Sequence, residues 1–332
     1  MITETPTASD DTGTLPAALL GESQAAHRLR ADLAAASRAS RVLLEAEPGL
    51  DAVDVGRQLH VMSSRRGPFV VIECAASEPE SIERELFGTE RADGELETVV
   101  PGAALARARG GTLFLADVSD LSAPAQARLG RVVRDGEARL AATGAAVLLD
   151  LCLIAHTSSD AVGETQEGRL RRELLRQFAR TRVVVPPLRQ RREDLPVMVR
   201  QLVTEACDHA GVARKEVAPA AMTLLAALPW AHNLAGMRET IARTVIHSSA
   251  STVLLEDALH GLRLNDSLGG QAPLHPLRIA RREFERDYIA KALQHHRGRI
   301  ADAARTLGIQ RTNLYRKARQ LGLSVTRPTR RS

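Results

Sequence analysis

The stretch that decides the fold of the C-terminal part of this chain is Ile300-Ala-Asp-Ala-Ala-Arg-Thr-Leu-Gly-Ile-Gln-Arg-Thr-Asn-Leu-Tyr-Arg-Lys-Ala-Arg319. Two helices that cross closely need a small residue at the crossing, and Ala304 supplies it. The turn between them needs a residue that tolerates positive φ, and Gly308 supplies that. Leu314, Ala318 and Leu321 follow at intervals of four and three, so they share one face of the second helix. This spacing predicts a helix-turn-helix over 300–321.

The remaining face of the second helix carries the side chains that suit contact with DNA. Arginine, asparagine and threonine read base edges and hold phosphates. We predict that double-stranded DNA is contacted by Arg299, Arg311, Thr312, Asn313, Tyr315, Arg316, Lys317 and Arg319. The alternative is an ordinary charged helical hairpin.

Charge is distributed unevenly along the 332 residues. Residues 271–332 hold 15 Lys and Arg against 4 Asp and Glu, a net charge of +11, whereas residues 1–270 hold 30 against 36, a net charge of −6. Three arginines lie in the tail at 324–332, and without them the C-terminal part still carries +8. Such an asymmetry indicates a basic module that meets a polyanion, attached to a mildly acidic body.

Upstream, the pattern of apolar residues predicts an α/β fold. Short apolar runs predict buried strands at Arg41–Leu44, Phe69–Ile72, Thr112–Leu115, Val147–Ile154 and Val183–Val185. Helical patterns lie between them at Ala52–Ser63, Glu80–Phe87 and Ala123–Asp135. Strands that alternate with helices favour βαβ units and a parallel sheet. The predicted organisation is a disordered N-terminus (1–15), an α/β subdomain (16–190), a helical subdomain (191–262), a linker (263–276), a helical DNA-binding domain (277–323) and a basic tail (324–332).

Composition excludes several classes of protein. No apolar run approaches the roughly 20 residues that a membrane span needs, and the acidic N-terminus does not resemble a secretory signal. Cys74, Cys152 and Cys207 are too widely spaced for a disulfide framework, so we expect reduced thiols. The pair His295-His296 is read as part of a turn, and no metal is expected. The chain is predicted to be cytoplasmic and associated with the nucleoid.

Two resemblances to known families follow from these motifs. Ala303-Ala304, Leu307-Gly308 and Leu314-Tyr-Arg-Lys317 resemble the Fis-type module of bacterial transcription activators over roughly Phe284–Leu323. That likeness implies a dimer whose two recognition helices meet successive major-groove sites. The chain from about Gly21 to Glu256 resembles the AAA+ domain of bacterial enhancer-binding proteins, the ATPases that activate sigma-54 promoters. The matching stretches are Gly67–Val70, Glu85–Gly88, Gly110–Leu115, Arg128–Gly136, Pro186–Asp194 and Trp230 with Asn233.

The nucleotide pocket departs from the pattern of that family. The family's phosphate loop reads GESGTGK, and here Ala46-Glu-Pro-Gly-Leu-Asp-Ala52 aligns with it. Glycine N–H groups and a lysine hold phosphates in such loops, whereas Asp51 adds a negative charge and Ala52 replaces the lysine. The Asp-Glu pair that organises Mg²⁺ aligns with Ala116-Asp117.

Three further departures concern the lid, the fingers and the sigma contact. The lid arginine aligns with Ala235; of two finger-like arginines, Arg171 is kept and the second aligns with Gln177. The sigma-contacting loop GAFTGA is replaced by Ala92–Glu97, an acidic stretch. We therefore predict a degenerate nucleotide pocket formed by Glu47, Gly49, Ala52, Ala116, Asp117, Arg171 and Ala235, with no catalytic residue.

These observations lead to one favoured hypothesis and two alternatives. The favoured hypothesis is a sequence-specific DNA-binding transcription regulator that has lost ATP hydrolysis and sigma-54 contact, needs no cofactor such as ATP or Mg²⁺, and is not an enzyme. The first alternative is a working ATP-dependent sigma-54 activator. The second is an interaction subunit that joins intact relatives, with which the retained Arg171 is compatible. Expected partners are DNA, further copies of the chain in a dimer or higher oligomer, and RNA polymerase or related AAA+ regulators; no membrane partner is expected.

Overall fold

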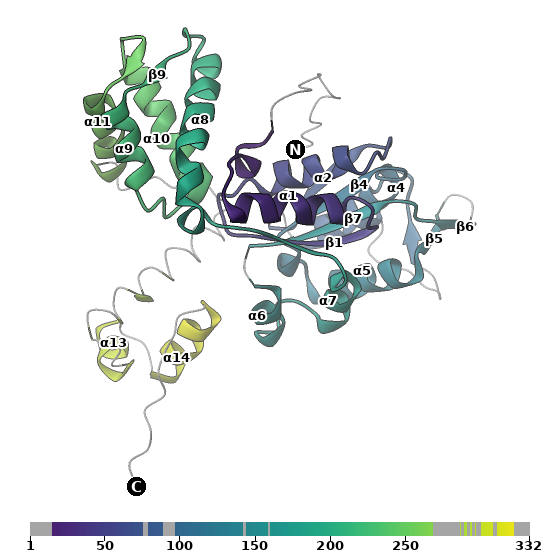
Figure 1. The fold of residues 1–332 in the computed structure, drawn as a ribbon. Helices are drawn as coiled ribbons and strands as arrows, with labels where there is room; N and C mark the ends of the chain where they lie inside the picture. The colour runs from purple at the N-terminus through teal and green to yellow at the C-terminus, as the bar shows by residue number, and fades with distance from the viewer. Residues whose placement is uncertain are drawn as a thin grey trace. The chain divides into compact units, whose positions relative to one another are not determined.

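The computed structural model describes residues 15–75, 79–88, 97–141, 144–158 and 160–267, and, in the C-terminal part, 286, 289, 290, 293, 296, 300–307 and 311–321. The chain divides into two compact units, Met1–Gly270 and Gln271–Ser332. Figure 1 shows the α/β part and the lid helices of the larger unit in purple to green and the described helices of the smaller unit in yellow.

The larger unit is built on a five-stranded parallel sheet. Its strands lie in the order β2-β4-β7-β1-β8 and comprise β1 (Arg41–Ala46), β2 (Phe69–Glu73), β4 (Thr112–Ala116), β7 (Cys152–Thr157) and β8 (Arg182–Val185). The register pairs Leu43 with Ala155 and Leu113 with Leu153. Valine, isoleucine and leucine fill these strands because both faces of a parallel sheet are covered. The predicted α/β fold class is confirmed.

Helices cover both faces of the sheet and divide its core into two clusters. Figure 1 shows α1 (Gln24–Ala36) and α2 (Ala52–Met62) on one face, and α5 (Ala123–Asp135) and α7 (Arg172–Phe178) on the other. Because side chains alternate along a strand, Leu44 packs in the α1–α2 cluster and Leu43 in the opposite cluster. The second face also carries α3 (Pro79–Phe87) and α4 (Ala104–Arg107), and α6 (Ala161–Gln166) precedes α7.

A small second sheet corrects one predicted strand. The run Val147–Ile154 is two strands, β6 (Ala146–Leu148) and β7, separated by Leu149–Leu151. The carbonyl of Asp150 accepts a hydrogen bond from the Gly110 N–H there, so the chain leaves one sheet and enters the other. Strand β6 pairs antiparallel with β5 (Glu137–Leu140), which pairs parallel with β3 (Thr98–Val99). An unbroken apolar run does not show where a strand ends.

The second part of the larger unit is a helical lid. Its helices are α8 (Leu195–Ala210), α9 (Pro219–Ala227), α10 (Asn233–His247) and α11 (Leu255–Ser267). Two predictions need correction here. The lid is not purely helical, since β9 (Glu216–Val217) pairs with β10 (Thr252–Val253). Helix α11 also extends through 263–267, the start of the predicted linker, because its apolar pattern continues to Leu264 before the glycines begin.

Short 3-10 turns join these elements. They are η1 (Ala17–Leu19), η2 (Val118–Asp120), η3 (Leu188–Gln190) and η4 (Arg192–Asp194), and η3 and η4 lead from the sheet into the lid. The three cysteines are buried and unpaired. Among the described residues, no helix has the length and apolar character needed to cross a bilayer. Residues 1–14 and 268–285 lie outside the described residues.

The smaller unit has a core of its own. Helices α13 (Ile300–Thr306) and α14 (Arg311–Gln320) pack together through Ala303, Ala304, Leu314 and Ala318, all fully buried or nearly so. Ile289 and Leu293, which precede α13 in the chain, join the same cluster. Most of 277–293, and Gly308 in the turn, lie outside the described residues.

Candidate nucleotide pocket and DNA interface

The segment Ala46–Asp51 connects the end of β1 to the start of α2, where a parallel sheet of this type binds ligands. Gly49 has φ 82°, and a Cβ there would lie 2.4 Å from the backbone carbonyl oxygen of His232. The lid therefore approaches the loop too closely for any side chain at position 49. Ala52 is the first residue of α2, and no side chain of the segment 46–52 is cationic.

Acidic side chains of this loop are paired with basic side chains from the lid and its connection. Asp51 accepts two hydrogen bonds from the guanidinium of Arg238 on α10, at 2.7 and 3.1 Å. Glu47 accepts two from Arg189 in η3, at 2.6 and 2.5 Å. Both contacts are bidentate, which is the strong geometry for an arginine and a carboxylate.

These ion pairs, together with burial and the charge of Asp51, shift the pKa values of the two arginines and of a nearby aspartate. The hydrogen bond to Asp51 raises the pKa of Arg238, and the one to Glu47 raises the pKa of Arg189. Burial, followed by the nearby negative charge of Asp51, raises the pKa of Asp54 on the first turn of α2. Each guanidinium is thus fully charged and neutralised by a carboxylate within the protein.

The ends of β4 and β7 carry Asp117 and a histidine, His156, that the sequence analysis had not singled out. His156 on β7 is buried; its Nδ1 accepts a hydrogen bond from the Asp117 backbone N–H at 3.2 Å, and its Nε2 lies 3.3 Å from the Ala46 carbonyl oxygen. The ring therefore connects the tips of β1, β4 and β7. One carboxylate oxygen of Asp117 is buried without a hydrogen-bond partner. The alanine at 116 precedes it at the end of β4.

Backbone strain is concentrated in the same region. Among the described residues, five non-glycine residues have positive φ, and four of them are Asp51, Asp117, Trp230 and Asn233. Such conformations cost free energy and persist where the surrounding structure imposes them. The loop, the tip of β4 and the segment leading into α10 are held in place by their neighbours.

The remaining two predicted pocket residues, Arg171 and Ala235, lie directly before α7 and in the first turn of α10. Arg171 precedes α7 with its side chain partly exposed, 3.8 Å from Glu173, and its N–H donates to Gln126. Ala235 lies in the first turn of α10, where its N–H donates to the Gly49 carbonyl at 3.0 Å. The structure thus brings Ala235 to the phosphate loop, by its backbone and not by a charged side chain. Gln177 accepts a hydrogen bond from Arg41.

The predicted acidic replacement of the sigma-contacting loop requires one correction. Residues 92–96 lie outside the described residues, but Glu97 is buried and does not lie at an exposed tip. It forms ion pairs with Arg128 and Arg131 on α5, and the guanidinium of Arg128 stacks 4.1 Å over the ring of Phe87. Glu97 pairs with a buried arginine, a role that the sequence pattern alone does not show.

In the smaller unit, the predicted second helix exists as α14. Arg311 is exposed at its start, and Leu314 and Ala318 are buried as predicted. Tyr315 was expected to face outward; it is instead partly buried against the core, since it lies next to Leu314 on the edge of the apolar face. Lys317 is half-buried. Arg299 and the side chains of Thr312, Asn313, Arg316 and Arg319 lie outside the described residues.

The charge of this loop differs from that of a phosphate-binding junction. A phosphate-binding junction offers N–H groups and positive charge, whereas this loop contributes the carboxylates of Glu47 and Asp51. The lid contributes Arg238, which donates two hydrogen bonds to Asp51. Neither arginine that pairs with this loop was assigned a site role from the sequence: Arg189 lies within the matching stretch Pro186–Asp194, and Arg238 lies outside the matching stretches. The sequence did contain a signal for the Asp51–Arg238 pair: an aspartate in the loop and an arginine one helical turn beyond Ala235.

Comparisons with known proteins match three parts of the chain to family models. Residues 19–184 match the sigma-54 interaction domain, residues 189–267 match the AAA+ ATPase lid domain, and residues 280–321 match the bacterial regulatory protein, Fis family. Similar curated proteins include the nitrogen assimilation regulatory protein NtrX of Azorhizobium caulinodans, 32% identical over 93% of this chain and 70% of that protein. The DNA-binding transcriptional regulator NtrC of Salmonella typhimurium is 30% identical over 92% and 70%.

Solved structures agree with these matches. NtrX from Brucella abortus in complex with ADP is 29% identical, with a TM-score of 0.63 over 94% of this chain and 70% of that one. The same protein in complex with ATP has a TM-score of 0.62 over 92% and 69%. The Thermotoga maritima RuvB Holliday junction branch migration motor, 15% identical with a TM-score of 0.55 over 93% and 90%, shares the fold. Both predicted resemblances are confirmed.

The comparisons contradict the prediction that the chain is not an enzyme. The matched lid is that of AAA+ ATPases, and a homologous structure holds ATP in one crystal and ADP in another. The prediction gave single side chains, chiefly Asp51 and Ala52, more weight than the match of a whole domain, and it was wrong. The expectation that no cofactor is involved is corrected at the level of the family, in which nucleotide complexes are known.

Proposed function

Since this chain belongs to the sigma-54 interaction domain family and ends in a Fis-type helix-turn-helix, we propose that it is a sequence-specific DNA-binding regulator of transcription. One observation carries this proposal: α13 and α14 pack through small and apolar residues while Arg311 is left exposed at the start of α14. A recognition helix needs its apolar side on the core and its polar side free for the major groove.

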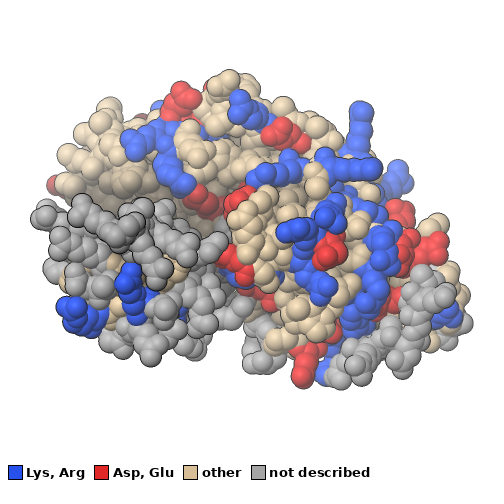
Figure 2. Space-filling model, turned by 90° about the horizontal axis from the view of Figure 1, so that it is seen from below, with Lys and Arg blue, Asp and Glu red and all other residues tan. Residues whose placement is uncertain are grey.

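The charge of the smaller unit supports the same conclusion. Its net charge of +11 suits a polyanion, whereas the larger unit is mildly acidic. Figure 2 shows Lys and Arg side chains interspersed with Asp and Glu side chains over the described surface seen from below. We propose that DNA is contacted by Arg299, Arg311, Thr312, Asn313, Arg316 and Arg319, and that Tyr315 and Lys317 contribute from the edge of the helix. A regulator of this kind works in the cytoplasm, on the nucleoid.

We further propose that copies of the chain assemble through the AAA+ unit and pair through the DNA-binding unit. The support is Arg171, which lies partly exposed before α7, with Glu173 at 3.8 Å as its ion-pair partner. Related AAA+ regulators and RNA polymerase are the further partners that this assembly would meet. An assembly test is analytical ultracentrifugation of the wild type and of Arg171→Ala; equal sedimentation of the two would remove Arg171 from the interface.

The segment Ala92–Glu97, which replaces the sigma-contacting loop, also bears on how the regulator would act. Glu97 is committed to Arg128 and Arg131 inside the protein, so it is not available to a sigma factor. We propose that the regulator acts at its promoters through the place where it binds, without a sigma-54 contact from this segment.

Chromatin immunoprecipitation with sequencing tests the proposed function directly. It gives the recognition site and shows whether the bound promoters carry the sigma-54 pattern. The expected result is a set of enriched sites that share one motif. A purified chain that shifts such a site without nucleotide, and whose affinity falls steeply as the salt concentration rises, completes the expected result. Absence of enrichment at any genomic site would overturn DNA binding as the function.

A further inference from the structure

Four contacts tie the loop Ala46–Asp51 to the lid and its connection, beside a longer one of 3.4 Å from the Asn233 side-chain amide to Glu47. Two are the ion pairs of Asp51 with Arg238 and of Glu47 with Arg189. The other two involve the loop backbone: the Gly49 carbonyl accepts from the Ala235 N–H at 3.0 Å, and the Pro48 carbonyl accepts from the Asn233 side-chain amide at 3.1 Å. The residues joined lie about 140 to 190 positions apart in the chain. These contacts hold the lid directly against the loop.

The Asp51–Arg238 pair is the part of this contact that depends most on charge. The Asp51 side chain is 15% exposed and that of Arg238 42%, so the carboxylate lies inside the contact and the guanidinium reaches it from the lid. Asp51 makes no capping hydrogen bond to α2, although it directly precedes that helix. Its oxygens are therefore directed to the lid and not to its own helix.

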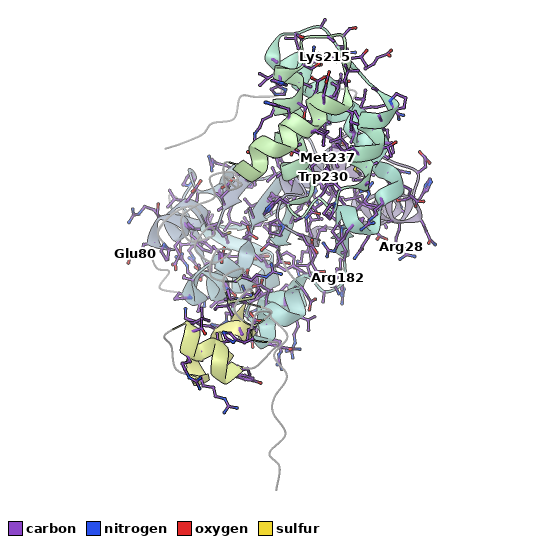
Figure 3. The ribbon with its side chains drawn as sticks, turned by 90° about the vertical axis from the view of Figure 1, so that its left-hand side faces the viewer. Arg28, Glu80, Arg182, Lys215, Trp230 and Met237 are labelled. Carbon is purple, nitrogen blue, oxygen red and sulfur yellow. The ribbon has the colours of Figure 1, made fainter. Side chains whose placement is uncertain are left out.

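The lid segment that presents Arg238 is itself held in a strained conformation. Trp230 and Asn233 have φ of 44° and 49°. The Trp230 indole N–H donates to the Leu225 carbonyl at 2.9 Å, and the Leu188 N–H donates to the Asn233 side chain. Figure 3 labels Trp230 and Met237, which lie together within the lid, where both belong to the buried cluster that continues to the sheet. These hydrogen bonds and the buried cluster hold the start of α10 in place. Arg238 therefore faces the loop from a rigid helix.

We propose that Asp51 acts as a built-in anion: its carboxylate holds Arg238 and keeps the lid closed on the loop without nucleotide. In a phosphate-binding junction the negative charge at this place belongs to the ligand. Here the protein supplies it, so the polyphosphate of a nucleotide has to displace Asp51 before it can reach Arg238. Glu47 and Arg189 form a second connection of the same kind. The proposal concerns the larger unit and does not depend on the DNA that the chain binds.

Hydrogen exchange in the nucleotide-free, full-length protein measures how readily the lid opens from the loop. The reporter is the peptide that contains Ala235, whose N–H is bonded to Gly49. Asp51→Asn keeps a residue that tolerates positive φ but removes the charge. We expect this variant and Arg238→Gln each to exchange about tenfold faster at that peptide, and the double variant to exchange no faster than either single one.

Matched controls separate lid opening from general destabilisation. Asp208→Asn removes a carboxylate from a lid ion pair with Arg214 that does not touch the loop, and it should leave the reporter unchanged. Peptides from β1 and β7 report whether each variant is folded. Should Asp51→Asn fail to fold, Glu47→Gln gives the same test through the second pair. If the Ala235 peptide exchanged at the wild-type rate in both single variants, that result would overturn the proposal.

Nucleotide affinity gives the second readout. Mg·ATP should bind Asp51→Asn about tenfold more tightly than the wild type, because Arg238 is then free to meet phosphate. The gain should vanish in the double variant Asp51→Asn with Arg238→Gln. Equal affinity of the wild type and Asp51→Asn, including no binding by either, would overturn competition between Asp51 and the polyphosphate. A gain that persists in the double variant would overturn the role of Arg238.

Discussion

Asp194 and Arg191 form a buried ion pair at the point where the sheet leads into the lid. Arg191 is 1% exposed and Asp194 2%, and the Arg191 guanidinium also donates to the carbonyls of Ala18 and Leu20. Asp194 accepts from both the N–H and the hydroxyl of Ser23. Gly21, with φ 109°, comes so close that a Cβ would lie 2.1 Å from the Asp194 carboxyl carbon. These residues fasten the N-terminal segment to the base of the lid.

Asp194→Asn should therefore lower the free energy of unfolding by about 3–5 kcal/mol, because it leaves Arg191 buried without its counter-charge. Burial alone would raise the pKa of Asp194, but hydrogen bonds from Ser23 and Arg191 outweigh it and hold that pKa below 3.8. A lowered carboxyl pKa stabilises the folded state above pH 3.8, and this stability is lost as the pH falls through the lowered value.

Urea unfolding of the wild type and Asp194→Asn across this pH range checks both statements. The difference between the two proteins should shrink as the pH falls below about 4. Asp208→Asn, whose carboxylate lies in an exposed pair, serves as the control and should change stability by no more than about 1 kcal/mol. A difference that does not vary with pH would contradict the assignment to the Asp194 charge.

His60 on α2 should make stability depend on pH near neutrality. Burial, and then the positive charges of Arg57 and Arg65, lower its pKa from 6.5, and its Nδ1 lies 2.8 Å from the Thr112 hydroxyl. The unfolded chain takes up this proton at a higher pH than the folded chain, so stability falls as the pH drops through 6.5. Between about pH 8 and about pH 5.5, the melting temperature of the wild type should fall further than that of His60→Gln. Parallel melting curves for the two proteins would contradict this.

At the scale of elements, the helix-turn-helix shows how one short helix serves two purposes. Helix α14 has Leu314 and Ala318 in the core and Arg311 exposed at its start. The apolar residues recur with the helical period, so their burial followed from the sequence pattern. Tyr315 lies at the boundary of the two faces, where periodicity alone does not decide between core and solvent.

Arg311→Ala should weaken binding to the recognition site by about 1–3 kcal/mol without unfolding α14, because the side chain is exposed. Fluorescence anisotropy with a labelled site measures the loss, and Arg214→Ala, on the lid, is the matched control. Leu314→Ala should abolish binding in a different way, since removing a fully buried leucine costs about 2–5 kcal/mol of stability. Unchanged affinity in Arg311→Ala would remove this residue from the DNA interface.

At the scale of the whole molecule, the two compact units have separate hydrophobic cores. The clusters of the larger unit lie around the sheet and the lid, and the smaller unit has its own cluster around Ala303 and Leu314. Domains with independent cores unfold as separate cooperative units.

Differential scanning calorimetry should accordingly resolve more than one transition in the full chain. Addition of the recognition DNA should raise the transition of the smaller unit, because a ligand that binds the folded state stabilises it by mass action. The transition of the larger unit should stay where it is. An equal rise in both would show that the units are energetically coupled.

Much of this architecture followed from local patterns in the chain. The parallel sheet, α5 at Ala123–Asp135 and the burial of Leu314 and Ala318 were predicted, because apolar periodicity and turn residues act over a few positions. The family matches confirm both resemblances that short motifs suggested. The same local view misplaced two boundaries: the apolar run after Val147 conceals the break between β6 and β7, and α11 continues into the predicted linker.

The meaning of the loop Ala46–Asp51 was decided by tertiary structure. Its departures from a phosphate loop were visible residue by residue, but their partners, Arg189 and Arg238, lie far away in the chain. Glu97 likewise looked like part of an acidic tip until the fold placed it against Arg128. Local periodicity determines which elements form and which faces are buried. Which charge meets which depends on packing between distant segments, and a pattern of short range does not contain that information.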